Sequence, residues 1–213
     1  MDSYSPPQGP LKVIHLDHEL LAIDKPSGLL SVPGKGPELA DCLLTRVQAD
    51  YPSALLVHRL DRDTSGVMLF ALSPLAQKHL GQQFERRVTK KVYVAEVWGR
   101  LEGKGMIDLP LIVDWPNRPR QMVDHERGKA AITEWRAKKP GDITRVELRP
   151  QTGRSHQLRV HMAELGHPIL GDPFYATPDA LAAADRLKLH AWKLSVRHPD
   201  GGEWLELRAK LPF

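Results

Sequence analysis

The sequence has 213 residues, of which 41% are hydrophobic, so it is long enough to bury a core and too apolar to be disordered. Its formal net charge of +4 and its pI of about 9.2 permit a polyanionic partner without requiring one. Charges and prolines interrupt every apolar run, which excludes a membrane-spanning segment, and the first ten residues lack the pattern of a secretory signal.

The predicted elements begin after a Pro-rich segment. Residues 1–10, MDSYSPPQGP, are predicted to form a loose arm. Residues 11–213 are predicted to form one continuous domain, because no repeat, low-complexity tract or linker interrupts them. Alternation of apolar and polar residues predicts strands with one wet face. In chain order these strands cover residues 11–17, 19–24, 67–72, 91–99, 131–138, 143–150, 187–196 and 204–211.

Helices are fewer than strands. They are predicted over residues 41–51, 73–87 and 156–165. Ser73 is the predicted N-cap of the second helix, with Pro74 in its first turn, and Ser155 is the candidate N-cap of the third. Many strands with few helices between them predict an α+β fold, built on a mixed, mostly antiparallel central sheet flanked by a few helices.

The most informative segment is residues 55–72, LLVHRLDRDTSGVMLFAL. One apolar strand enters, a short stretch of His, Arg and Asp follows, and a second apolar strand leaves. Charged residues at the mouth of buried strands are costly unless they are paired or used. Asp61 and Asp63 beside Arg59 and Arg62 therefore indicate either a solvated, salt-bridged loop or a catalytic carboxylate.

The string HRLDxxTSG in this segment resembles the signature motif of the RluA family of pseudouridine synthases, and the resemblance implies that Asp61 is the essential catalytic residue. Further segments resemble the family in the family's own order, and together they cover nearly everything from residue 11 onwards. They are DKPSGLLSVPG at 24–34, KKVYVAEVWG at 90–99, LRPQTGRSHQLRVHMAELGHPILGDPFY at 148–175 and RLKLHAWKLSVRHP at 186–199.

The resemblance implies an isomerase that breaks the bond from ribose to a uracil nitrogen, rotates the base and rejoins it through a ring carbon. The uridine must leave its stack, and the catalytic carboxylate must be ionised close to the sugar. Asp61 could attack covalently or abstract a sugar proton. Tyr93 is expected against the flipped base, Arg159 beside Asp61, and Arg59 where the uridine used to lie. Taken without the resemblance, Tyr93 could be plain core and Arg159 a surface helix residue.

Further residues are predicted to contact RNA. Arg154 precedes the third helix and could bind a phosphate there or form a structural salt bridge. His58 and Gln157 lie within the motifs. Each basic cluster could equally be an ordinary solvated face. These clusters are Arg86, Arg87, Lys90 and Lys91; Arg118 and Arg120, which follow Trp115; and Lys138 and Lys139.

We predict neither a metal nor a cofactor. His156 and His161 are five residues apart, which is the wrong spacing for a shared helical face, and there is no cysteine cluster. No Gly-rich phosphate loop precedes a helix. The single cysteine, Cys42, excludes an internal disulfide framework and is expected to be a small buried residue in a cytoplasmic protein.

Longer members of the family carry a small RNA-binding domain before the segment that begins here at Asp24, and none is expected in this chain. The segments SVPG, DYP, DWPNRP and FYATPDA resemble members that modify both a large-subunit rRNA hairpin and a tRNA anticodon stem-loop. A cytoplasmic monomer acting in rRNA and tRNA processing is therefore expected. Three alternatives stay open: a family member without the added domain that acts elsewhere on tRNA, a catalytically silent RNA-binding protein, and a metal-independent hydrolase that uses Asp61 or Asp63 with His58.

Overall fold

The computed structural model describes residues 4–213, and the chain divides into two compact units. The first unit comprises the chain up to Lys90 together with His190–Pro212, and the second comprises Lys91–Leu189 with Phe213. The chain thus leaves the first unit and returns to it at the end, whereas the sequence predicts one continuous domain. No helix among residues 4–213 is long and apolar enough to cross a membrane.

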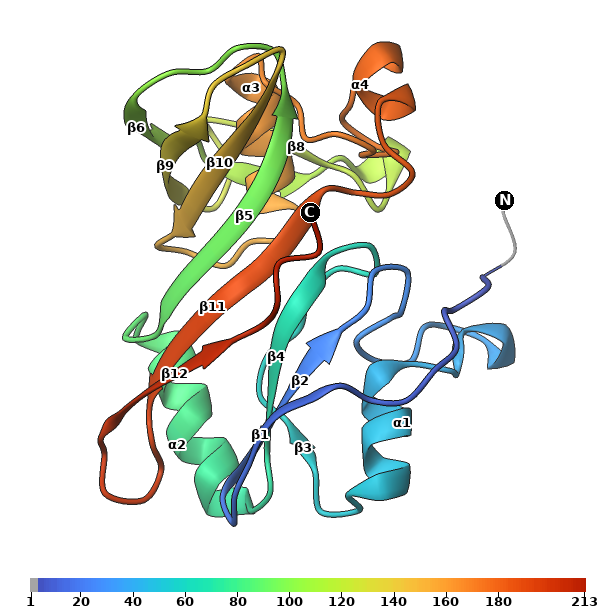
Figure 1. The fold of residues 1–213 in the computed structure, drawn as a ribbon, viewed down its shortest axis with the longest axis vertical. Helices are drawn as coiled ribbons and strands as arrows, with labels where there is room; N and C mark the ends of the chain where they lie inside the picture. Colours follow the sequence, from blue (N-terminus) through green and yellow to red (C-terminus); the bar gives the residue numbers. More distant parts are fainter. Residues whose placement is uncertain (1–3) are drawn as a thin grey trace. The chain divides into compact units, whose positions relative to one another are not determined.

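The sheet of the first unit has strand order β1-β2-β4-β11, with β3 paired to β4 and β12 paired to β11 (Figure 1). All these pairings are antiparallel except β4 with β11, where Ser65 and Gly66 lie beside His190 and Ala191. The strands are β1 (Val13–Leu16), β2 (Leu20–Lys25), β3 (Leu55–Leu56), β4 (Ser65–Ala71), β11 (Leu189–Arg197) and β12 (Trp204–Arg208).

Helices cover both faces of this sheet, α1 (Leu43–Asp50) on one side and α2 (Pro74–Glu85) on the other (Figure 1). Leu21 and Ile23 of β2 pack with α1, and Leu20 and Ala22 pack with α2. All seven residues of β4 are buried. A strand covered on both faces has no wet side, which explains why VMLFA is a continuous apolar run.

Two caps explain where these helices begin. Ser73 accepts a hydrogen bond from the Ala76 amide, as predicted, and Pro74 follows it. Cys42 is fully buried and is the N-cap of α1, where its sulfur accepts from the Thr45 amide. A short 3₁₀ helix, η1 (Pro37–Leu39), precedes α1.

The second unit holds an antiparallel sheet of order β5-β10-β9-β6 and a small hairpin of β7 and β8. Its strands are β5 (Lys90–Trp98), β6 (Lys104–Asp108), β7 (Leu111–Val113), β8 (Gln121–Val123), β9 (Ile132–Lys139) and β10 (Ile143–Pro150). Its helices are η2 (Trp115–Asn117), α3 (Gln157–Glu164) and α4 (Pro178–Ala182).

Helix α3 is buried on more than one side. Leu158 and Met162 pack in the core against the sheet of the second unit, and Val160 packs against the β7–β8 hairpin. The helix begins one residue later than predicted. Its N-cap is His156, which has φ 53° and no side-chain cap hydrogen bond, and Gly166 follows the helix end as expected. Both units combine mostly antiparallel sheets with few helices, so the α+β prediction is confirmed.

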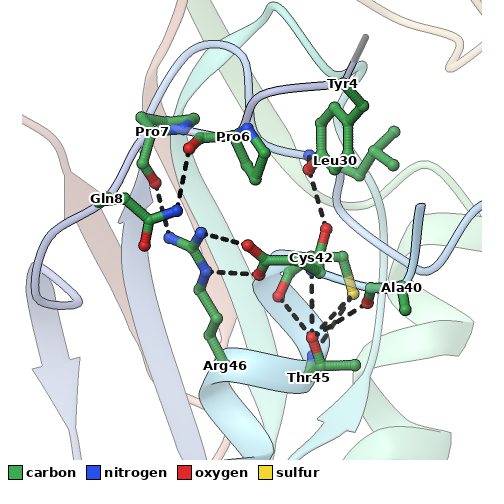
Figure 2. A network of polar contacts seen from close by, with 10 residues as sticks. Tyr4, Pro6, Pro7, Gln8, Leu30, Ala40, Cys42, Thr45 and Arg46 are labelled. Carbon is green, nitrogen blue, oxygen red and sulfur yellow. Dashed lines mark hydrogen bonds and ion pairs between the residues drawn. The ribbon is translucent and has the colours of Figure 1, made fainter. Parts of the chain in front are cut away.

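The N-terminal arm, predicted to be loose, makes defined contacts over its described part; residues 1–3 lie outside the described residues. The Tyr4 hydroxyl donates to the Asp41 carbonyl at 2.9 Å and accepts from the Leu30 amide at 3.0 Å. Arg46 of α1 donates to the Pro7 carbonyl and forms a bidentate ion pair with Asp41 (Figure 2). The arm is thus fastened to α1 and to the loop that follows β2.

A carboxylate joins the two hairpins at one end of the first unit. Asp17 Oδ2 lies 2.6 Å from His15 Nε2 and 3.1 Å from His198 Nε2, while Oδ1 accepts from the amides of Glu19 and Leu20. Burial would raise the pKa of Asp17, but these hydrogen bonds outweigh it and hold the pKa far below the usual value. Burial disfavours the charged form of His198, but the Asp200 carbonyl and Asp17 outweigh it and raise the pKa of His198.

We expect His198→Gln to lower the free energy of unfolding by about 0.5–1 kcal/mol at pH 6 and by less at pH 9. The folded pKa of His198 lies above its ordinary value of 6.5, so its contribution is complete below pH 6.5 and is lost as the pH rises through the folded pKa. Urea unfolding of both proteins between pH 5.5 and 9 measures the difference. His125→Gln, at an exposed histidine, is the control. A difference that stays constant across this range would contradict the prediction.

Candidate active site

Asp61 lies half-buried in the loop between β3 and β4, in the first unit. The Thr64 amide donates to the Asp61 carbonyl at 3.2 Å, so the catalytic candidate opens a tight turn. Leu60 before it is buried and Arg59 is exposed. Hydrogen bonds hold the backbone of this turn both before and after Asp61. We call residues 57–64 the Asp61 loop.

The segment that follows β2 holds the backbone of the Asp61 loop. Ser31 Oγ donates to the Leu60 carbonyl at 2.6 Å and accepts from the Leu60 amide at 3.1 Å. The Gly28 amide donates to the Arg62 carbonyl at 3.0 Å, and Ser27 Oγ donates to the Asp63 carbonyl at 2.7 Å. The motif DKPSGLLS is therefore the support of the Asp61 loop. Sequence reasoning gave no role to these serines.

Lys25 supplies the strongest of these supports. Its side chain is fully buried, and Nζ donates to the carbonyls of Pro26 at 2.9 Å, Leu29 at 2.6 Å and Arg62 at 2.8 Å. A buried ammonium costs free energy unless it is hydrogen-bonded, so these carbonyls stabilise it and become fixed in return. The sequence signal for this role was a lysine directly after the apolar run of β2.

Contacts with β4, α2 and β11 hold the two ends of the Asp61 loop. His58 Nε2 accepts from the Leu69 amide at 3.0 Å, and its ring stacks on Phe84 of α2 with centroids 4.6 Å apart. Ser65 Oγ lies 2.9 Å from His190 Nδ1 of β11. These contacts give His58 a structural role in holding the loop, and its predicted contact with RNA stays a prediction.

The other predicted catalytic residues belong to the second unit. Tyr93 lies on β5 opposite Leu148 of β10 and is half-buried against the core. Arg159 lies on α3 and is 1% exposed, which excludes the reading of a surface helix arginine. Its Nε and Nη2 donate to the two carboxylate oxygens of Asp172 at 2.7 and 2.6 Å.

Aromatic residues surround the guanidinium of Arg159. Its Cζ lies 5.2 Å from the ring centre of Phe174 and 5.3 Å from that of Tyr175. The Tyr175 ring also lies 5.4 Å from the guanidinium of Arg120, and the Tyr175 hydroxyl accepts from the Gln121 amide at 2.7 Å. Burial raises the pKa of Tyr175. The fold thus brings Arg159 and Arg120 to the same ring, an arrangement that the sequence did not indicate.

Gln157 is an internal residue of the second unit, and its predicted contact with RNA stays a prediction. It is 4% exposed, and its amide oxygen accepts from Thr152 Oγ1 at 2.6 Å and from the Arg154 amide at 3.0 Å. Its amide nitrogen donates to the Ile132 carbonyl and to Thr133 Oγ1. Arg154 itself is half-buried, and its Nε donates to the Ala130 carbonyl at 3.2 Å.

The remaining basic candidates each have a separate local environment. Arg118 stacks over Trp115 with its Cζ 3.9 Å from the ring centre. Lys90 lies 4.6 Å from the centre of the Trp204 ring, and Arg86 is the exposed C-cap of α2. Lys138 pairs with Glu147 at 3.1 Å. These contacts leave each residue's predicted role toward RNA as a prediction.

The histidines of α3 are engaged inside the second unit. His161 Nδ1 lies 2.9 Å from Thr133 Oγ1, and Nε2 lies 3.0 Å from the Leu109 carbonyl. Burial lowers the pKa of His161 and so favours the neutral ring. His156 Nδ1 lies 2.7 Å from the Tyr175 hydroxyl. Within residues 4–213, no group of three His, Cys, Asp or Glu side chains is arranged to hold a metal ion.

Comparisons with known proteins identify the family of this chain. Residues 19–164 match the family described as RNA pseudouridylate synthase. The chain is 53% identical to the dual-specificity RNA pseudouridine synthase RluA of Yersinia pestis, over 94% of this chain and 99% of that protein. It is 52% identical to the protein of the same name from Escherichia coli K12, over 100% and 99% of the two chains.

Solved structures give the same result. Human RNA pseudouridylate synthase domain containing 1 has a TM-score of 0.80 and 26% identity, covering 98% of this chain and 87% of the human one. Human RNA pseudouridylate synthase domain containing 4 has a TM-score of 0.75 and 25% identity, covering 94% and 88%. The chain therefore belongs to the RNA pseudouridylate synthase family.

Proposed function

We propose that this enzyme isomerises specific uridines in two kinds of RNA, a large-subunit rRNA hairpin and a tRNA anticodon stem-loop. The observation that carries the proposal is the identity of about 52% over the full chain to relatives named dual-specificity RNA pseudouridine synthases. The enzyme acts as a cytoplasmic monomer without a metal or cofactor. The isomerisation has no net gain or loss of atoms or electrons, so its balance requires no co-substrate, oxidant or reductant.

Asp61 is the catalytic carboxylate of this proposal. The bond from ribose to the uracil nitrogen breaks, the base turns, and a bond forms to a ring carbon, whose proton is lost while the nitrogen gains one. Asp61 either attacks the sugar or removes a sugar proton, and both roles need an ionised group held at a fixed position. The bonds from Ser27, Gly28 and Ser31 to its neighbours in the loop support that requirement.

Arg159 supplies the positive charge for Asp61, and Tyr93 supplies an aromatic surface for the flipped base. A guanidinium has five N–H donors in a fixed plane, so one arginine can serve two carboxylates on different edges. Asp172 takes Nε and Nη2 of Arg159. Stacking of the base on Tyr93 would contribute about 1–3 kcal/mol.

Arginines and lysines outside the catalytic group bind the RNA backbone. Arg59 is exposed next to Asp61 and fills the place that the uridine leaves. Arg118 and Arg120 lie on the loop between η2 and β8, where Trp115 and Tyr175 provide rings beside them. Phosphate contacts made with Arg86, Lys90 and Arg154 add to these. Such contacts make the affinity fall with rising salt concentration.

The testing experiment uses the purified enzyme with EDTA and no added cofactor. Unmodified tRNA and a large-subunit rRNA fragment are incubated with it, and pseudouridine is mapped by carbodiimide labelling and primer extension. We expect one modified uridine in each RNA, with turnover unaffected by EDTA. Modification of only one RNA would remove the dual specificity and leave the enzyme class. Loss of turnover in EDTA, restored by a divalent cation, would contradict the metal-independent mechanism.

A further inference from the structure

The ion pair between Arg159 and Asp172 is almost fully buried. The two side chains are 2% and 0% exposed, and two parallel N–H···O bonds join them. A flexible arginine side chain held at two nitrogens has one orientation of its guanidinium plane. Because a buried unpaired cation is costly, the Asp172 carboxylate stabilises Arg159 inside the unit.

The Asp172 carboxylate is itself fixed by its surroundings. Oδ1 accepts from the Phe174 amide at 2.9 Å and from the Tyr175 amide at 3.3 Å. Gly171 before it has φ 67°, and a Cβ there would lie 2.1 Å from the Arg186 carbonyl oxygen, so the backbone is held against a neighbouring segment. The carboxylate therefore has a rigid base from which to orient the arginine.

Asp124, in the same unit, also accepts hydrogen bonds from two backbone amides and an arginine. Asp124 Oδ1 accepts from the amides two and three residues later, and Oδ2 accepts from Nε and Nη2 of Arg127. There the arginine is 72% exposed and belongs to the same turn, so the carboxylate only caps that turn. At Asp172 the arginine is instead a buried one from α3, and its Nε and Nη2 donate to different carboxylate oxygens.

We propose that Asp172 is a positioning residue for pseudouridine formation, which holds the Arg159 guanidinium in the single orientation that its proposed role in the reaction needs. The proposal rests on the proposed role of Arg159 beside Asp61. Asp172 touches neither substrate nor the reacting atoms. Its effect on the reaction passes through Arg159, and it should therefore appear in kcat and vanish when Arg159 is absent.

The test compares Asp172→Asn, Asp172→Glu, Arg159→Ala and the double variant Asp172→Asn with Arg159→Ala. Asp172→Glu keeps the charge and moves the carboxylate by about 1.5 Å, roughly one carbon–carbon bond. Displacements of this size lower turnover by about 100-fold in preorganised sites. We expect both Asp172 variants to lower kcat by about 10- to 100-fold, with KM for RNA changed less than about threefold. In the Arg159→Ala background, Asp172→Asn should lower kcat by less than about twofold.

Asp124→Asn is the matched control and should keep kcat within about twofold of wild type. Thermal unfolding and RNA binding verify that each variant is folded. If Asp172→Asn does not fold, Asp172→Glu decides: wild-type kcat overturns the proposal, and so does failure of both variants to fold. Equal loss of kcat from Asp172→Asn with and without Arg159 also overturns it. Normal turnover of Arg159→Ala would instead overturn the proposed role of Arg159, a separate outcome.

Discussion

Asp61→Asn should lower turnover by about 10⁴-fold or more while leaving RNA binding within about threefold of wild type. Asparagine has the same shape but no negative charge, so it can neither attack the sugar nor accept its proton. The turn that Asp61 opens uses its backbone carbonyl, which the substitution does not change. Single-turnover pseudouridine formation and a filter-binding titration on the same RNA measure the two quantities.

Asp63→Asn is the matched control for this prediction, because it makes the same chemical change two residues along the same loop. The Asp63 side chain forms an ion pair with Arg62 at 2.9 Å, and exposed pairs of this kind contribute about 1 kcal/mol or less. We expect turnover within about threefold of wild type. Equal losses in both variants would point to general damage of the loop. A loss of binding as large as the loss of turnover in Asp61→Asn would show that Asp61 is not purely catalytic.

Gly66→Ala should lower the free energy of unfolding by about 3 kcal/mol or more. Gly66 has φ 114°, a conformation that residues with a Cβ rarely adopt. An added Cβ would lie 2.2 Å from the Ala191 carbonyl oxygen and 2.7 Å from the Ala191 nitrogen, which are backbone atoms of β11. The methyl group therefore fits only if β4 and β11 separate, and that separation would also disturb the Asp61 loop.

Gly81→Ala provides the control for Gly66→Ala. Gly81 lies in the interior of α2, and an added Cβ meets no atom within 4 Å. Alanine at this site should raise the free energy of unfolding by about 0.5–1 kcal/mol, because glycine is the poorer helix former. Urea unfolding of the three proteins gives both values. Similar stabilities for the two variants would mean that the β4–β11 contact yields readily to the methyl group.

The elements predicted from the sequence are those whose pattern is local. The run VMLFA predicts β4, and Ser73 with Pro74 predicts the start of α2, because each signal lies within the element itself. The small strand β6 was not predicted. Its sequence, KGMID, contains a glycine, which usually marks a loop. Gly105 is accommodated there because the Trp135 indole of β9 covers it, a contact that exists only in the folded sheet.

The residues of the candidate site also fall into two groups, those with a local sequence signal and those without one. Asp61, Tyr93 and Arg159 stand in motifs that can be matched residue by residue. The residues that support the Asp61 loop and Arg159 cannot be identified from a motif in this way, because their roles depend on partners elsewhere in the sequence. Lys25 and Ser31 act on carbonyls of the Asp61 loop 37 and 29 residues later. Asp172 stands in the string GDP, which on its own indicates only a turn. Its partner Arg159 lies 13 residues earlier, in α3.

The pairing of β4 with β11 has a consequence for how the protein is made. Ser65 meets His190 across 125 residues of chain, so the sheet of the first unit cannot be completed until β11 has been synthesised. Such distant pairings fold slowly, since the loop must be closed before the contacts form. Until then, the sheet formed by strands β1 to β4 exposes the edge of β4 that later pairs with β11. The Asp61 loop of the nascent enzyme is therefore held on its β4 side only after Ala191 has emerged from the ribosome to pair with Gly66.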